Sequence, residues 1–163
     1  MNCVVCGSKV KKEKTEIHHY TACGLSKIYL MGVEILRCTN SECEDEEIVV
    51  PNIEKLHELV AMELASQKSK LLPEEIKYLR TYLGFSGVDF AKKIGVSPET
   101  ITRWEKGQVN MKDSTERLLR VLVLSKAGPF RNYEGLETFA TVENRTPKKR
   151  SFQASAHGWL MAA

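Results

Sequence analysis

The stretch that decides the fold is Gly95-Val96-Ser97-Pro98-Glu99-Thr100-Ile101-Thr102-Arg103-Trp104-Glu105-Lys106-Gly107. Gly95 is suited to end one helix, Ser97 to cap the next, and Pro98 to occupy its first turn. Ile101 and Trp104 stand three residues apart and therefore share one helix face. A short helix, a tight turn with glycine and a second short helix make a helix-turn-helix.

Working outward from this stretch, apolar residues recur at helical spacing on both sides. We expect helices over 73–83, 87–94, 98–106 and 113–126. Val88, Phe90, Ala91 and Ile94 should supply the apolar face of the second of these helices. A further amphipathic helix over about 52–66 follows Pro51. We therefore expect a helix-turn-helix DNA-binding domain over 71–127 and a linker helix over 51–70.

The helix over 98–106 is the one expected to enter the major groove of DNA. Its exposed side should carry Glu99, Thr100, Thr102, Arg103 and Lys106. Arg103 is the best base reader, because its guanidinium can bridge both acceptors of guanine. Glu99 either accepts a hydrogen bond from cytosine or holds Arg103 through an i,i+4 pair. Ser97, Thr102 and Lys106 should contact phosphates. The competing interpretation is a helical core that binds nothing.

Four of the five cysteines form two pairs, Cys3-x2-Cys6 and Cys38-x4-Cys43. Four thiolates in a tetrahedron suit Zn²⁺, and a closed set of four is typical of a structural site. Short β-favouring runs lie between the pairs, in a segment too small to bury much apolar surface unaided. We therefore expect residues 1–50 to form a small zinc-stapled β domain. The alternative is that the four cysteines are buried and unrelated. The four-residue spacer between Cys38 and Cys43 departs from the two-residue spacer that is usual in zinc sites.

Cys23, near His18 and His19, lies outside both pairs. It replaces one of the four ligands, forms a second site, or is a small packed side chain, and the sequence leaves these alternatives open. A catalytic zinc needs an open coordination position and a nearby acid or base. Neither histidine has a partner that makes it a convincing base, so we expect no enzyme.

The 163 residues carry a net charge of +3, and 42% of them are hydrophobic, as in ordinary globular proteins. Residues 1–50 carry six basic and eight acidic side chains, whereas residues 71–127 carry ten and seven. This asymmetry is a weak indication of a polyanionic partner for the helical part. No apolar run approaches the roughly 18 residues that cross a bilayer, and the first residues lack a secretory pattern. We expect a cytoplasmic protein without a membrane partner.

The stretch over 95–107 resembles the recognition segment of Cro/CI-type (XRE) regulators. Together with Cys3-x2-Cys6-Gly7 and the second cysteine pair, residues 1–126 resemble the YgiT/MqsA family of zinc-finger helix-turn-helix proteins. The expected fold class is α+β, with a small N-terminal zinc-stapled β domain followed by an all-α Cro/CI-type helix-turn-helix domain.

The resemblance implies a sequence-specific DNA-binding transcriptional regulator, an (auto)repressor, with a structural zinc. It also implies a homodimer on a palindromic double-stranded DNA operator. The alternative function is an antitoxin of a type II toxin–antitoxin pair, whose N-terminal zinc domain binds a protein toxin.

Several roles follow by position from the resemblance. Glu99 and Arg103 match base-reading positions, and Ser97 matches a backbone-contacting one. Arg80 and Glu105 match a partly buried ion pair that braces the first helix of the domain against the third. Gly87 stands where many relatives have a glutamine that contacts phosphate, so Ser86 or main-chain N–H groups must supply that contact.

Residues 128–163 show little regular pattern, and we expect a partly disordered C-terminal extension there. Its basic run, Arg145-Thr146-Pro147-Lys148-Lys149-Arg150, is either a DNA-binding arm or part of a solvated tail. Trp159 is assigned no role.

Overall fold

The computed structural model describes residues 1–127, 146–156 and 158–162. The chain forms two compact units, which are described separately. One comprises Met1–Tyr20, Lys27–Leu56 and Lys149–Ala163, and the other comprises Thr21–Ser26 and His57–Lys148. Strands occupy the first unit and helices dominate the second, which agrees with the expected α+β class.

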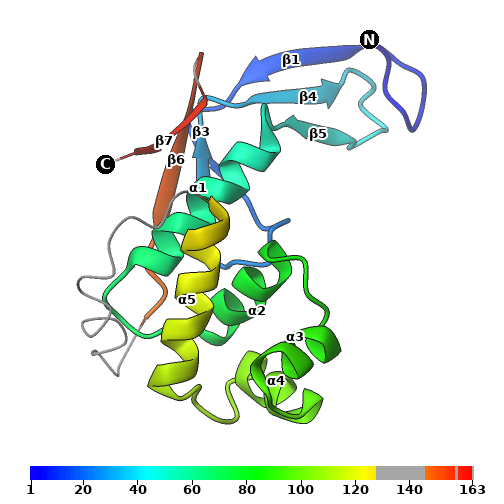
Figure 1. The fold of residues 1–163 in the computed structure, drawn as a ribbon. Coiled ribbons are helices and arrows are strands. Elements are labelled where there is room, and N and C mark those ends of the chain that lie inside the picture. Colours follow the sequence, from blue (N-terminus) through cyan, green and yellow to red (C-terminus); the bar gives the residue numbers. More distant parts are fainter. Residues whose placement is uncertain (128–145, 157, 163) are drawn as a thin grey trace. The chain divides into compact units, whose positions relative to one another are not determined.

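The helical unit contains the elements that the sequence predicts, in the predicted order (Figure 1). They are α1 (Ile53–Ser66, of which residues from His57 onward belong to this unit), α2 (Pro73–Tyr82), α3 (Gly87–Ile94), α4 (Pro98–Glu105) and α5 (Asp113–Ala127). The core of the unit includes Leu79, Phe90, Ile101 and Leu119, each at most 1% exposed. Among the helices of the described residues, none has the length and apolar character needed to cross a membrane.

The predicted helix boundaries around the turn are confirmed by the caps. Ser86 and Ser97 precede α3 and α4, and their hydroxyls accept hydrogen bonds from the N–H groups of Asp89 and Thr100. Gly95 ends α3 with φ 73°, in the left-handed region that glycine adopts without strain. The expected face of α3 is only partly right, because Val88 is 49% exposed.

A buried arginine joins α5 to the end of α1. Arg120 is 0% exposed, and its guanidinium binds the Glu116 carboxylate at 2.6 Å. The same guanidinium donates to carbonyl oxygens of the last turn of α1 and of the segment after it, namely those of Leu64, Ala65, Gln67 and Ser69. The last carbonyls of a helix have no partner within the helix. Arg120 satisfies two of them, those of Leu64 and Ala65, and places a positive charge at the negative end of the helix dipole.

The strand unit contains two sheets. The first has the order β1-β4-β5 and is antiparallel, with strands β1 (Val10–Lys14), β4 (Glu34–Cys38) and β5 (Glu46–Val49). The second has the order β2-β3-β6-β7, with strands β2 (His18–His19), β3 (Ile28–Met31), β6 (Arg150–Ser155) and β7 (Gly158–Ala162).

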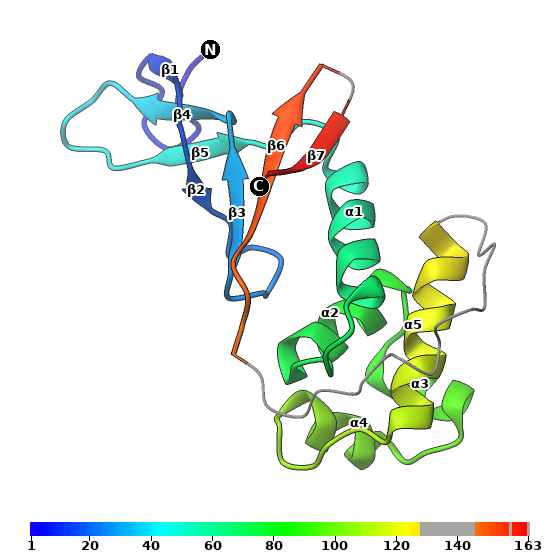
Figure 2. The same cartoon turned by 90° about the vertical axis from the view of Figure 1, so that its left-hand side faces the viewer.

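The expectation of an irregular C-terminal extension is wrong for β6 and β7. Strand β6 pairs in parallel with β3, and β7 lies outside β6 at the sheet edge (Figure 2). The reason is burial of Phe152 and Trp159, which are 0% and 8% exposed. The part of the expectation that concerns residues 128–145 lies outside the described residues.

The basic run is only partly available as a DNA-binding arm. Arg150 is 7% exposed and lies opposite Ile28 in the sheet. The ammonium of Lys149 lies 4.8 Å from the centroid of the Tyr29 ring, a cation–π contact. The end of the run therefore belongs to the sheet.

Trp159 ties β7 to the segment before α1, because its indole Nε1–H donates to the carbonyl oxygen of Pro51 at 2.8 Å. Trp159→Phe should lower the free energy of unfolding of the strand unit by about 1 kcal/mol, since one hydrogen bond is lost while the ring stays buried. Urea denaturation followed by circular dichroism measures this loss. Leu160→Phe, at a neighbouring position that is 60% exposed, should change it by less than about 0.5 kcal/mol.

Candidate functional site

The two predicted cysteine pairs meet in space. The sulfur atoms of Cys3, Cys6, Cys38 and Cys43 all lie within 4.8 Å of one another. Cys3 Sγ is 3.8 Å from Cys43 Sγ, and Cys6 Sγ is 3.4 Å from Cys38 Sγ. Four sulfurs around Zn²⁺, each at about 2.3 Å, are about 3.8 Å apart in a tetrahedron. The cluster therefore has the size and the ligand chemistry of a metal site.

The first pair sits on a tight turn between Cys3 and Ser8. The Cys3 N–H donates to the Ser8 carbonyl at 2.8 Å, and the Gly7 N–H donates to the Cys3 carbonyl at 3.0 Å. Gly7 has φ 76°, which explains why a glycine follows the pair. The Val5 N–H points at Cys3 Sγ from 3.4 Å. A donor aimed at a sulfur stabilises the thiolate that a metal requires.

The longer spacer of the second pair is accommodated by a turn built on Asn40. The Asn40 N–H lies 3.4 Å from Cys38 Sγ, and the Asn40 side-chain oxygen accepts from the Glu42 N–H at 3.1 Å. The Cys43 N–H donates to the Asn40 carbonyl at 3.0 Å. These bonds fold the four intervening residues back, so Cys43 reaches the sulfur of Cys3.

The thiols of the first pair differ in acidity in the absence of a metal. The Ser8 side chain and its backbone lower the pKa of Cys6 to about 6. The Cys6 backbone lowers the pKa of Cys3, but the Asp45 carboxylate and burial outweigh it and raise that pKa to about 12. The sulfur of Cys3 lies 3.1 Å from an Asp45 oxygen. The cysteine spacing gives no indication of this contact, and Asp45 is therefore not predictable from the sequence pattern.

The remaining candidate ligands lie elsewhere. Among the described residues, the four-cysteine cluster does not include Cys23, His18 or His19. Burial raises the pKa of Cys23, as expected for a packed thiol. The ring of His19 stacks on Tyr29 in the second sheet, with centroids 4.8 Å apart.

Helix α4 has one buried face and one exposed face. Ile101 and Trp104 are 1% and 5% exposed and turn into the core. The opposite face presents Glu99, Thr102, Arg103 and Lys106 to solvent, and Thr100 is half-buried beside it. The backbone of Glu99, the Ser97 hydroxyl and the charge of Arg103, in that order, lower the pKa of Glu99. A carboxylate and a guanidinium thus share the exposed face one turn apart.

The hydroxyls predicted to contact phosphate are already placed by local bonds. Ser97 Oγ lies 3.1 Å from Thr100 Oγ1, and the Thr102 hydroxyl donates to the Pro98 carbonyl at 3.1 Å. The Ser86 hydroxyl donates to the Asp89 carboxylate at 2.6 Å. Asp89 therefore adds a negative charge at the start of α3, where contact with the DNA backbone is expected.

The ion pair between α2 and the end of α4 is confirmed. The Arg80 guanidinium donates to the Glu105 carboxylate at 2.5 and 3.1 Å, and their side chains are 11% and 14% exposed. Arg80 also donates to the Phe85 carbonyl at 2.6 Å. The pair fixes the C-terminal end of α4 against α2, which orients the exposed face of α4.

With this geometry in place, comparison with known proteins gives one match. Residues 76–115 match the helix-turn-helix family model. The matched residues run from α2 through α3 and α4 to the start of α5. The match supports an XRE-type helix-turn-helix and, with it, a DNA-binding regulator. No curated protein and no solved structure matches the chain.

Proposed function

We propose that the chain is a sequence-specific DNA-binding transcriptional regulator, an (auto)repressor of the YgiT/MqsA type. The observation that carries the proposal is α4, which follows a glycine turn, buries Ile101 and Trp104, and presents Arg103 to solvent. A helix with this arrangement places its exposed residues at base edges in the major groove. Arg103 reads guanine, and Glu99 lies one helical turn away, close enough to hold the Arg103 side chain in position.

Zinc is the metal that best suits the N-terminal cluster. Four thiolates leave no open position for a substrate or water, so the site is structural. The ion would be held by Cys3, Cys6, Cys38 and Cys43. Its binding would stabilise the folded strand unit, whose three-stranded sheet is short. The N–H groups of Val5 and Asn40 would support the negative sulfurs.

A homodimer on a palindromic operator, which the resemblance implies, would compensate for the modest charge of the helical part. Three net positive charges over residues 71–127 are few for strong binding through phosphates alone. Two copies of α4, one in each half-site, double the directed contacts. Ser97, Thr102 and Lys106 would position each copy on the backbone, and Ser86 would do so at α3.

Arg103→Ala tests the assignment of α4 as reader. The variant should lose operator discrimination, by about 1–3 kcal/mol per half-site, while its thermal unfolding is unchanged. The measurement is the ratio of dissociation constants for an operator selected by the wild-type protein from random duplexes and for a scrambled duplex. Lys106→Ala should weaken binding to both duplexes alike and reduce the salt dependence.

An exposed arginine of the other unit serves as the matched control. Arg37→Ala removes the same charge and should leave the ratio of the two dissociation constants unchanged. If Arg103→Ala discriminates between the duplexes as well as the wild type does, α4 is not the reader.

A further inference from the structure

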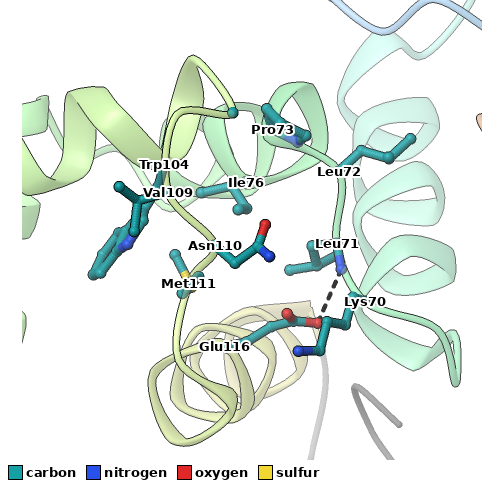
Figure 3. Close-up of a pocket in the computed structure, with 11 residues that line it drawn as sticks. Lys70, Leu71, Leu72, Pro73, Ile76, Trp104, Val109, Asn110, Met111 and Glu116 are labelled. Carbon is teal, nitrogen blue, oxygen red and sulfur yellow. Dashed lines mark hydrogen bonds between the residues drawn. The ribbon is translucent and has the colours of Figure 1, made fainter. Parts of the chain in front are cut away.

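The helical unit contains a cavity of about 380 Å³, lined by residues of the start of α2, the loop after α4 and α5 (Figure 3). Its apolar lining includes Leu71, Ile76, Trp104 and Met111, each at most 7% exposed. Its polar lining includes the Glu116 carboxylate, Asn110 and Lys70. Ligand pockets in proteins span roughly 300–1,000 Å³ and combine apolar walls with a few polar groups. The cavity therefore has the volume and the combination of apolar and polar lining groups that are typical of a small-molecule site.

One oxygen of Glu116 is fully engaged. Oε1 accepts hydrogen bonds from the Leu71 N–H at 3.0 Å and from two nitrogens of Arg120 at 3.2 and 2.6 Å. Figure 3 draws the bond from Leu71 at the edge of the cavity. These three donors saturate that oxygen and fix the plane of the carboxylate.

The other oxygen of Glu116 is not engaged. Oε2 accepts no hydrogen bond from the described residues, although the Glu116 side chain is only 2% exposed. Oε2 is not one of the fully buried atoms left without a partner, so it is accessible from the cavity that Glu116 lines. An occupant of the cavity that carries a hydrogen-bond donor can therefore reach this oxygen.

The surroundings select the charge of that occupant. A positively charged donor forms a hydrogen bond to a carboxylate roughly twice as strong as a neutral one does. The aromatic ring of Trp104 in the wall also attracts cations. Lys70 is already paired with Asp113 at 3.1 Å, so its ammonium is compensated. An anion would instead meet the open oxygen of Glu116 and be repelled.

We propose that this cavity binds a small organic amine with an apolar body. The ammonium donates to Oε2 of Glu116, and the apolar body packs against Ile76, Trp104 and Met111. Since Trp104 belongs to α4, the bound amine touches the helix proposed to read DNA. The site itself requires no DNA and is testable on the free protein.

The test is a titration with 2-phenylethylamine, followed by the NMR resonances of the two indole N–H groups, with Trp159→Phe identifying which belongs to Trp104. The amine should shift the Trp104 resonance saturably and leave that of Trp159 in place. The matched probes are 2-phenylethanol, which should bind at least about tenfold more weakly, and phenylacetate, which should not bind. No saturable shift at millimolar amine means that the cavity holds water only and overturns the proposal, as does equal binding of phenylacetate.

Two variants locate the site. Glu116→Gln should weaken amine binding at least about tenfold, because the charge that assists the hydrogen bond is lost. Val109→Phe fills the cavity without removing a hydrogen bond and should abolish binding even if Glu116→Gln folds poorly. Val88→Phe is its control, since Val88 and Val109 are 49% and 50% exposed and only Val109 lines the cavity. Unchanged affinity in Val109→Phe overturns the assignment.

Discussion

Cys3→Ser is expected to release zinc and to unfold the strand unit. Cys3 is 5% exposed, and its sulfur lies at the buried side of the cluster. A serine hydroxyl stays protonated at neutral pH and is a poor zinc ligand, so three sulfurs remain. Structural zinc contributes about 10–16 kcal/mol in small metal-stapled domains, which exceeds the stability of most domains of this size. The residues of α2 to α5 should stay folded.

The measurement is zinc content per chain together with the two indole N–H resonances. Cys3→Ser should contain little zinc, keep the native resonance of Trp104 and lose that of Trp159. Cys23→Ser, the matched control at the fifth cysteine, should keep one zinc ion and both resonances. Cys43→Ser should behave like Cys3→Ser if Cys43, despite the four-residue spacer before it, is a zinc ligand. Full zinc content in Cys3→Ser would contradict the assigned ligand set.

Arg120→Leu is expected to destabilise the helical unit by about 3–5 kcal/mol, because it leaves the buried Glu116 charge without its partner. Two losses contribute. Glu116 loses its ion pair, and the carbonyl oxygens at the end of α1 lose their donor. Chemical denaturation, followed by the circular dichroism signal of the helices, measures the total loss in free energy of unfolding.

A double variant separates the two losses. Replacing a whole buried ion pair by apolar residues is often neutral, so Glu116→Leu combined with Arg120→Leu would recover stability if the pair were all that mattered. We expect the double variant to remain destabilised by about 1–3 kcal/mol, since the α1 carbonyls and the Leu71 N–H, which donates to Glu116 in the wild type, are then unsatisfied. Full recovery would show that the end of α1 does not depend on Arg120.

Much of the helical unit is predictable because its rules are local. Ser97 caps a helix through a bond to a residue three positions on, and Gly95 ends one through its own φ. The cysteine pairs are predictable for a similar reason, since a metal restricts which residue types and spacings work. The ligand pattern expected for a shared ion therefore links residues 3 and 43 without knowledge of the fold.

The features that could not be predicted from the sequence depend on contacts with residues far away along the chain. Strand β6 is short, and its residues pair with Ile28–Met31, about 120 positions earlier. The alternation of buried Phe152 with half-buried neighbours is visible in principle, but a run of this length is ambiguous. Arg120 was hidden for a different reason. An arginine in an amphipathic helix usually lies in solvent, and only the end of α1 explains why this one is buried.

The parallel pairing of β3 with β6 also sets an order of events during synthesis. Domains generally fold as units while the chain emerges from the ribosome. The strand unit cannot complete its second sheet until residues 150–162 have been made, by which time all of α1 to α5 has emerged. The cysteine cluster needs only residues up to Cys43 and so can assemble first. The strand unit is thus started early, at its cysteine turns, and is completed only after the residues of the helical unit have been made.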